Sequence, residues 1–242
     1  YGSGTKSVRS DAGLIRYLMR HRHTTPFEMC EIKLHVKLPI FVARQWIRHR
    51  TANVNEYSAR YSILDREFYV PPVEAVAEQS ASNRQGRGEA LAADAADAVR
   101  ARMRDEAQGA FDLYDHLLGE DAADAPAVAR ELARAVLPLS TYTQWYWKID
   151  LHNLLHFVAL RADPHAQSEI RAYAAVLLDL VERWVPVTAA AFRDYRLEGA
   201  SLSRGQLEAI RRRLRGETVT AEDVGLSTRE WRELATILDE ER

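Results

Sequence analysis

Arginine side chains are concentrated in one short segment of this chain, residues 44–60. The segment holds four arginines and one glutamate, which gives a local charge of +3 in a chain whose formal net charge is −2. A guanidinium is planar and offers several N–H donors, so arginines on both sides of a loop can bind the oxygens of one phosphate. The hydroxyl of Ser58 lies among them and adds another donor. The segment indicates a site for a phosphate-bearing ligand, although charge alone is equally typical of a solvated basic surface.

The elements that must position this segment follow from the periodicity of apolar residues. Apolar and polar residues alternate over Cys30–Leu38, which predicts a β-strand, and helical spacing follows over Pro39–Ile47. Arg48 and Arg50 are therefore expected where that helix ends, ahead of a loop that carries Ser58. Upstream, a helix is predicted over Ala12–His21 with Asp11 as its N-cap. Downstream, a short strand is predicted over Glu67–Val70, stopped by two prolines.

The remainder of the chain is predicted to be mostly helical. Gln79–Gly88 is polar and glycine-bearing, so it is expected to be a mobile surface connection. Helices are expected over residues 89–118, 127–137, 151–160 and 163–185, with one or two more in a charged tail after Gly199. Asp163 and Pro164 are predicted to begin the helix at 163–185, which places His165 in its first turn. Pro186 should kink or end that helix.

Composition limits the class of protein. With 242 residues, of which 47% are hydrophobic and 28% charged, the chain can bury the core of one large domain. We expect a single catalytic domain over 1–242, with a core over 1–198 and a charged helical extension over 199–242. The 33 Lys and Arg against 35 Asp and Glu provide no overall field for nucleic acid or membrane. Cys30 stands alone and no long apolar run is present, so a soluble, cytoplasmic protein is expected.

Family-like motifs occur in order along the chain. RHR followed by seven residues and a serine, Arg48 to Ser58, resembles the signature of flavin-dependent thymidylate synthases, and Asn55, Glu56, Arg60 and Tyr61 fit its longer form. Further segments that resemble the same family are HRHTTPFE (21–28), PIFVARQW (39–46), ARAVLPLSTYT (133–143) and LRADPHAQSEI (160–170). The resemblance runs from about Tyr1 to about Leu197 and leaves the tail uncovered. Five motifs in order favour a ligand site over a solvated surface.

The resemblance implies a reaction and its participants. It implies reductive methylation of dUMP to dTMP, with 5,10-methylenetetrahydrofolate as carbon donor, FAD as cofactor and NADPH as reductant. It also implies an α/β (α+β-like) fold with a twisted, mostly antiparallel sheet flanked by helix bundles, and a homotetramer whose sites lie between subunits. No metal, nucleic acid or membrane partner is expected.

The resemblance also implies roles for particular residues. Arg161 would grip the uracil ring and favour ionisation at its N3, a role that suits a group too basic to lose its own proton. His23 and His165 correspond to positions near the flavin ring and the folate site. The residues expected to contact the flavin are Thr25, Arg48, His49, Arg50, Glu56, Asp150, Leu151, His152 and His156, with His165 beside them. The residues expected to hold dUMP are Gln45, Trp46, Ile47, Arg48, Ser58, Ala59, Arg60, Arg134 and Arg161.

Two features depart from the family's pattern. Asp150 stands where some relatives have asparagine, while His152 and His156 occupy positions that can hold arginine and asparagine. An acidic or imidazole group there is expected to alter how the flavin is held. The upstream strand and helix expected in the family do not precede Tyr1, and a longer natural protein is expected to supply them.

Other interpretations of single motifs are weaker. Ser58 has no orienting third group within its motif, so arginines on both sides suit phosphate binding better than nucleophilic catalysis. His152 and His156 are four apart, but the run HNLLH has no zincin glutamate. Gly2–Ser7 and Gly86–Gly88 have neither the order of a phosphate loop nor that of a Rossmann fingerprint. The aromatic run at 145–147 is more typical of a core or a subunit contact than of a stacking platform.

Two alternative functions remain open from sequence. The arginine loop and the basic tail run at 211–215 would also suit a protein that binds RNA or DNA through phosphates. A flavin-binding NADPH oxidase would keep the fold and lose the methylation. A flavin spectrum from the denatured protein would argue against the nucleic-acid-binding alternative. A requirement for dUMP in product formation would argue against the oxidase.

Overall fold

The structure is a computed structural model that describes residues 8–81, 86–119, 124 and 126–238. The chain divides into two compact units. One unit spans Arg22–Val185, and the other combines Tyr1–His21 with Pro186–Arg242. The single catalytic domain with an extension from residue 199 stays a prediction.

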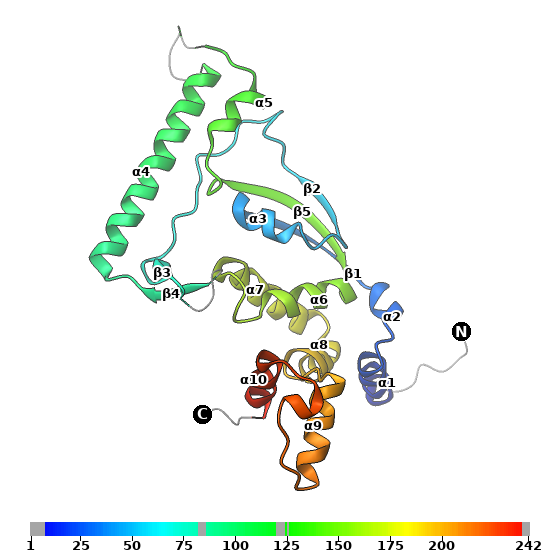
Figure 1. Ribbon diagram of the computed structural model, residues 1–242. Helices are drawn as coiled ribbons and strands as arrows, with labels where there is room; N and C mark the ends of the chain where they lie inside the picture. The colour runs from blue at the N-terminus through cyan, green and yellow to red at the C-terminus, as the bar shows by residue number, and fades with distance from the viewer. Residues whose placement is uncertain (1–7, 82–85, 120–123, 125, 239–242) are drawn as a thin grey trace, which may run out of the picture. The chain divides into compact units, whose positions relative to one another are not determined.

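The unit Arg22–Val185 is built on a three-stranded antiparallel sheet. Its strands are β1 (Glu31–Pro39), β5 (Tyr142–Asp150) and β2 (Asn53–Glu56), with β5 in the middle (Figure 1). Val36 pairs with Trp145 across β1 and β5, and Val54 pairs with Trp147 across β2 and β5. The expected combination of helices with an antiparallel sheet is confirmed.

Helices cover one face of this sheet. They are α3 (Ile40–Trp46), α6 (Leu151–Arg161) and α7 (Ser168–Trp184). Trp46 of α3 lies 5.1 Å from Trp147 of β5 and 4.7 Å from Phe157 of α6, measured between ring centroids. Its ring also lies 5.6 Å from that of Tyr173 on α7. Trp145 and Trp147 are buried. They are therefore core residues, as expected for the aromatic run at 145–147.

The outward-facing residues of the sheet are polar or exposed. Lys33 and His35 of β1 and Tyr146 of β5 are exposed, and every residue of β2 is exposed. Side chains alternate between the two faces of a strand, which explains why Tyr146 is exposed between two buried tryptophans.

A second core cluster supports the segment that follows β2. It joins α4 (Ala93–Leu118) to α5 (Arg130–Ala133) and the 3₁₀ turn η2 (Arg134–Val136) through Phe111, Tyr114 and Ala133. The hydroxyl of Tyr114 accepts a hydrogen bond from Leu64 N at 3.4 Å. Arg66 forms ion pairs with Asp112 and Asp115 of α4. These contacts fix the loop that begins near Ser58.

Smaller elements complete this unit. They are α2 (Thr25–Glu28), η1 (Val73–Ala75) and the antiparallel pair β3 (Ala77–Gln79) and β4 (Arg87–Ala90). The pairing of β3 with β4 shows that both ends of the expected mobile connection at 79–88 are held by backbone hydrogen bonds, while residues 82–85 lie outside the described part.

The other unit is helical. Its elements are α1 (Val8–Arg20), α8 (Pro186–Phe192), the π-helix η3 (Arg193–Leu197), α9 (Arg204–Leu214), η4 (Glu222–Val224) and α10 (Thr228–Ile237). Arg16 of α1 forms an ion pair with Asp194 at 2.6 Å. Ser203 and Ser227 begin α9 and α10 with capping boxes. The expected helices of the tail and the break at Pro186 are confirmed. No described helix is long and apolar enough to cross a membrane.

Several predictions of secondary structure near the site were wrong or missed an element. β5 was not predicted, and β2 falls in a segment expected to be a loop. The helix expected from residue 163 begins at Ser168, because the Asp163 carboxylate accepts hydrogen bonds from the backbone N and Nδ1 of His165 and closes a turn instead. His165 therefore lies outside the helix.

Other corrections concern element boundaries. The first helix begins at Val8, so Asp11 lies in its first turn and is not its N-cap. The helix expected from residue 89 begins at Ala93 because Arg87–Ala90 pair as a strand. The helix expected over 127–137 is reduced to α5 and η2. The strand expected over Glu67–Val70 is a single bridge between Phe68 and Thr141.

Candidate functional site

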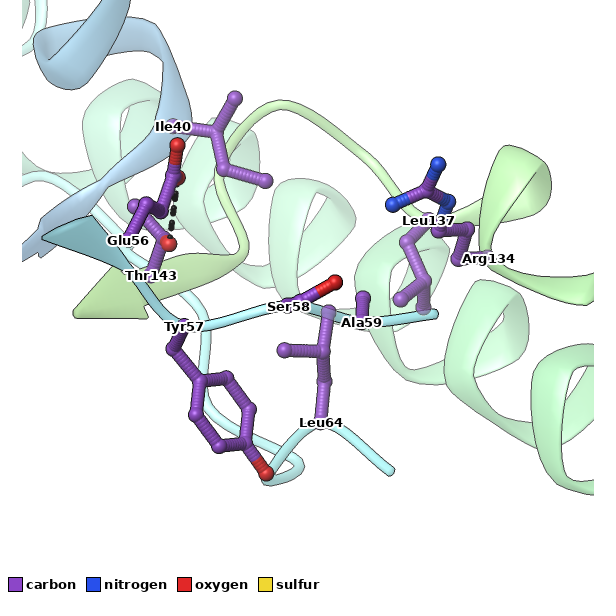
Figure 2. Close-up of a pocket in the computed structure, with 9 residues that line it drawn as sticks. All are labelled: Ile40, Glu56, Tyr57, Ser58, Ala59, Leu64, Arg134, Leu137 and Thr143. Carbon is purple, nitrogen blue, oxygen red and sulfur yellow. Dashed lines mark hydrogen bonds between the residues drawn. The ribbon is translucent and has the colours of Figure 1, made fainter. Parts of the chain in front are cut away.

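A pocket of about 290 Å³ opens where β2 leaves the sheet (Figure 2). The backbone N of Tyr57 donates to Gln144 O at 2.8 Å and continues the pairing beyond β2. The carboxylate of Glu56 accepts a hydrogen bond from the Thr143 hydroxyl at 2.7 Å. The residues that line this pocket, here called the Ser58 pocket, are Ile40, Glu56, Tyr57, Ser58, Ala59, Leu64, Arg134, Leu137 and Thr143.

Two arginines meet at Glu131 beside the Ser58 pocket. Arg60 Nη2 lies 3.1 Å from the Glu131 carboxylate, and Arg134 Nε donates to the Glu131 backbone carbonyl at 3.3 Å. The side chains of Arg60 and Glu131 are both more than half exposed. Figure 2 shows the Ser58 hydroxyl and the Arg134 guanidinium extending into the same open space. Two guanidiniums and a hydroxyl at a solvent-accessible pocket are suited to a phosphate.

A second group of polar side chains joins the ends of α3 and α6. Arg161 Nη2 donates to the backbone carbonyl of Gln45 at 3.4 Å. Arg161 Nε and Gln45 Oε1 are both buried without a hydrogen-bond partner among the described residues. Burial lowers the pKa of the Arg161 guanidinium, which nevertheless stays charged because its ordinary pKa is so high. One buried donor and one buried acceptor are thus left for a ligand.

Three other buried polar atoms lack partners among the described residues, and their setting differs. They are Trp46 Nε1, Trp145 Nε1 and Thr141 Oγ1. Those three residues are at most 2% exposed, whereas the side chains of Gln45 and Arg161 are partly exposed. Of the residues that carry these five atoms, Gln45 and Arg161 are therefore the two that extend to the protein surface.

A pair of imidazoles lies next to Arg161. The rings of His49 and His156 are 5.4 Å apart between centroids, and the Phe157 ring is 5.4 Å from that of His49. Burial lowers the pKa of His49, and the charges of His156 and Arg161 lower it further. Thr51 Oγ1 lies 3.0 Å from His49 Nε2. Burial and the nearby positive charges thus favour the neutral form of the His49 imidazole, which lies among polar and aromatic side chains.

Asp150 has a structural role in the same region. Its carboxylate caps α6 by accepting hydrogen bonds from Asn153 N at 2.9 Å and Asn153 Nδ2 at 2.7 Å. The acidic residue at this position is thus explained by helix capping. Its expected contact with the flavin stays a prediction.

Helix α3 links the two groups. Ile40 at its start lines the Ser58 pocket, and Gln45 near its end contacts Arg161. Five residues of α-helix span about 7.5 Å. A nucleotide is long enough to place a phosphate near one end of α3 and a base near the other.

The remaining expected residues are distributed around these groups. Arg48, Arg50 and Ile47 are exposed between α3 and β2. Trp46 and Leu151 are each 1% exposed, so both are core residues. Thr25 begins α2, which packs against α6, and His23 precedes it, exposed. His152 lies on α6, partly exposed. His165 lines a different pocket.

Several residues at the site were not predicted from sequence. Thr143 holds Glu56, Glu131 holds Arg60, and Tyr57 lines the Ser58 pocket. Period-two alternation over 142–150 was the signal for Thr143, because it places Thr143, Trp145 and Trp147 on one face. No sequence signal identified Glu131.

Two other interpretations of the sequence, a metal site and a nucleic-acid-binding tail, can be compared with the contacts in the structure. Within the described ranges, no group of three or more His, Cys, Asp or Glu side chains could hold a metal ion. In the basic tail run, Arg212 and Arg215 both pair with Glu217, at 2.7 and 2.9 Å, and Arg213 lies over the Trp231 ring at 4.8 Å. These arginines thus already have partners within the tail itself.

The fold and the site together define a mixed helix and sheet protein with an arginine-bearing pocket suited to a nucleotide. A family model described as "Thymidylate synthase complementing protein" matches residues 2–187. The chain is 65% identical over 239 residues to a "Flavin-dependent thymidylate synthase" of Gluconobacter oxydans, covering 99% of this chain and 78% of the relative. The chain therefore belongs to the flavin-dependent thymidylate synthase family, as its motifs indicated.

Other relatives agree. A flavin-dependent thymidylate synthase of Ruegeria pomeroyi is 60% identical over 98% of this chain and 78% of its own length. Among solved structures, the UMP/dUMP methylase PolB of Streptomyces cacaoi, bound with 5-Br dUMP, is 34% identical with a TM-score of 0.72, over 81% of this chain and 84% of PolB. The first two relatives cover nearly the whole chain, so the expectation that the resemblance ends near Leu197 was wrong for them.

Proposed function

We propose that this chain catalyses the reductive methylation of dUMP to dTMP, with 5,10-methylenetetrahydrofolate as carbon donor, FAD as cofactor and NADPH as reductant. The observation that carries the proposal is the unpartnered, buried donor and acceptor on Arg161 and Gln45, one helix away from an arginine-bearing pocket. The relatives named as thymidylate synthases and the dUMP-analogue complex of PolB support it.

A uracil ring could form hydrogen bonds with Arg161 Nε and Gln45 Oε1, the two buried atoms that lack partners among the described residues. The imide edge of uracil presents two carbonyl acceptors on either side of an N–H donor. Arg161 Nε can donate to a carbonyl or to an ionised N3, and Gln45 Oε1 can accept from N–H. A site that hydrogen-bonds a substrate group rejects analogues that lack it, because its own buried atoms would stay unpaired.

The nucleotide phosphate would bind at the Ser58 pocket. Ser58, Arg60 and Arg134 would supply donors, and Ala59, which lines the pocket, would contact it too. Arg60 must first leave Glu131, but an ion pair between exposed side chains is worth at most about 1 kcal/mol. The phosphate, with two charges and three acceptor oxygens, competes well for such an arginine.

The residues near α3 and α6 fit a flavin. Arg48 and Arg50 are exposed cations for a pyrophosphate, and His49 and His156 offer ring faces and polar edges. Glu56, Thr25, Leu151, His152 and His165, with His23 near the folate, would complete the site, with Asp150 acting chiefly through its cap of α6. These residues would hold FAD, and the chemistry that the flavin would supply, after reduction by NADPH, is the hydride that completes the methyl group.

Arg161 is the proposed catalytic residue. Its guanidinium would stabilise the negative charge that builds on the uracil ring as N3 ionises and C5 becomes nucleophilic. Partial burial strengthens this interaction, because the surrounding dielectric is lower than that of water. No nucleophile from the protein is required.

We further propose a homotetramer that works in the cytoplasm, where dUMP, folate and reduced nicotinamide occur together. The resemblance to the family, which implies sites shared between subunits, supports the tetramer. A partner chain would complete the Ser58 pocket and the Arg161 group. Size-exclusion chromatography with light scattering tests the tetramer.

One assay tests the proposed function. The purified protein is heat-denatured and the supernatant scanned for flavin absorbance, and the native protein is then incubated with dUMP, methylenetetrahydrofolate and NADPH. A flavin spectrum with dTMP formation that requires dUMP supports the proposal. NADPH consumption without dTMP would indicate an oxidase instead.

A further inference from the structure

A second polar pocket, of about 260 Å³, lies between the β3–β4 pair and the start of α7. Its lining residues carry two guanidiniums, one imidazole, one amide and two hydroxyls, and none of these lining residues carries a carboxylate. They are Ser80, Gly86, Arg87, Pro164, His165, Ala166, Gln167, Ser168 and Arg171. This pocket, here called the Arg87 pocket, is lined by Gly86 and Arg87 of the Gly86-Arg87-Gly88 motif, to which sequence alone assigned no role.

Arg87 is anchored by a buried carboxylate. The side chain of Glu169 is only 6% exposed and forms an ion pair with Arg87. It also accepts hydrogen bonds from the Tyr69 hydroxyl at 3.0 Å and the Ser168 hydroxyl at 3.2 Å. Desolvation opposes the charge on Glu169, but these donors keep its pKa below the ordinary value. A buried ion pair contributes little net stability, so its effect here is to fix the position of a guanidinium that is 38% exposed.

The other cation and the imidazole are also held in place. Arg171 Nη1 donates to the Pro164 carbonyl at 3.0 Å, which joins α7 to the turn before it. Asp163 binds both the backbone N and Nδ1 of His165, at 2.7 and 2.9 Å. The lining thus consists of preorganised donors, which lose little conformational entropy when an anion binds.

The backbone of the strand pair approaches closely at Gly88, next to Arg87. A Cβ added to Gly88 would lie 3.3 Å from the Gln79 carbonyl oxygen, tighter than most real contacts. The register of β3 and β4 also shifts between Ala77 and Gln79. A bulge with a close backbone approach of this kind redirects the side chain beside it, here Arg87.

We propose that the Arg87 pocket binds the oxyanion tail of a cosubstrate of this enzyme. The proposal rests on the proposed function, because His165 in this pocket is also expected near the flavin. Arg87 and Arg171 would bind the oxyanion from two sides, and the Ser168 hydroxyl would stay bonded to Glu169, which anchors Arg87. The tail is either the ribose phosphate that distinguishes NADPH from NADH or the glutamate carboxylates of the folate.

Steady-state kinetics of the holoenzyme test the proposal. Arg171→Gln is the principal variant, because it leaves the buried Glu169 pair intact, and Arg87→Gln is the second. Arg183→Gln, on the exposed side of the same helix, is the control. KM is measured for NADPH, NADH, and the mono- and triglutamyl forms of methylenetetrahydrofolate, with dUMP saturating.

The expected result is a rise in KM of at least about tenfold for NADPH but not NADH, or for the triglutamyl folate more than the monoglutamyl form. Tenfold is the lower end of the loss expected for one hydrogen bond to a charged group. The cosubstrate affected identifies the source of the oxyanion. Unchanged KM values for all four cosubstrates in Arg171→Gln and Arg87→Gln would overturn the proposal.

A binding experiment separates this outcome from failure of the proposed function. Titration calorimetry follows binding of 2′,5′-ADP and of triglutamate to the protein, with dUMP present to occupy the Ser58 pocket. If wild-type protein forms no dTMP, the proposed function fails. Binding of either probe that is lost in Arg171→Gln would still support the oxyanion site, and binding of neither would reject it.

Discussion

Arg161 Nη2 donates to the Gln45 backbone carbonyl, and each of these residues keeps one buried side-chain atom without a partner among the described residues. The contact ties the last residue of α6 to the last turn of α3. A donor and an acceptor are thereby held near one another at the cost of leaving both unpaired. Polar atoms kept in this state in a folded chain indicate a ligand that pairs with them.

Gln45→Leu should separate ligand binding from stability. A buried acceptor without a partner costs about 1 to 3 kcal/mol, so its removal should leave the free energy of unfolding unchanged or raise it. The Kd for dUMP should rise about tenfold, the loss expected for one hydrogen bond. Urea denaturation and calorimetry measure the two quantities.

The control for Gln45 is Gln206→Leu. The Gln206 amide is buried and bonded at both ends: its Oε1 accepts from Ser203 N at 2.8 Å and its Nε2 donates to Glu230 O at 3.3 Å. This variant should lose stability and keep dUMP binding. Loss of stability in Gln45→Leu with normal dUMP binding would contradict the ligand role of Gln45.

Glu131→Gln should strengthen dUMP binding. Glu131 competes with the nucleotide phosphate for Arg60, but both side chains are exposed, so the pair is worth at most about 1 kcal/mol. The Kd for dUMP should fall by no more than about fivefold, and the difference should shrink at high salt. Asp179→Asn, in an exposed pair with Arg183, should leave the Kd unchanged. Weaker binding in Glu131→Gln would mean that Glu131 positions Arg60 instead of competing for it.

Tyr69→Phe should destabilise the protein. The Tyr69 hydroxyl donates to the buried Glu169 carboxylate, and the burial of Tyr69 together with the charge of Glu169 raises the pKa of Tyr69. Removal of a hydrogen bond to a charged group costs about 1.5 to 3 kcal/mol, and partial exposure of Tyr69 favours the lower value. Tyr57→Phe, which removes an exposed bond to the Ile63 carbonyl, should cost less. Equal urea midpoints for the two variants would argue against the anchor at Glu169.

Stability should decrease on the acid side because of His49. Burial lowers the pKa of His49 in the folded protein below the ordinary value of 6.5. The unfolded chain therefore binds a proton first as the pH falls, so this contribution is fully present above pH 6.5 and is lost below it, until the folded pKa is reached. His49→Asn should flatten the dependence of the urea midpoint between pH 7.5 and 5, measured for comparison with His35→Asn at an exposed position. An unchanged slope would show that His49 titrates normally.

The sheet shows what sequence patterns can reveal. β1 was predicted because charged residues such as Lys33 and Lys37 alternate with apolar ones. β5 was missed although its residues alternate, because an exposed aromatic residue, Tyr146, separates two buried tryptophans and interrupts the alternation of polar with apolar residue types. Burial by partner elements is a tertiary property, and here it decided which face of the strand each aromatic residue occupies.

For the site, the sequence predicted candidate residues but not the contacts that hold them. Residue types and motif order predicted Arg48, Arg60, Arg134 and Arg161 as candidates, and the structure brings Arg60 to the carboxylate of Glu131 and Arg134 to its backbone carbonyl. The part played by Glu131 could not be predicted, because these contacts depend on how α5 packs against α4. The turn at Asp163 and the anchored Arg87 depend likewise on side-chain hydrogen bonds that no periodicity records.

Turnover by Arg161→Ala is the most direct test of the central claim, that this guanidinium activates the uracil ring. The variant is purified, its flavin content is measured by absorbance, and dTMP formation is followed with dUMP, methylenetetrahydrofolate and NADPH. The account predicts bound flavin close to the wild-type amount and no detectable dTMP. Full dTMP formation by Arg161→Ala would contradict it.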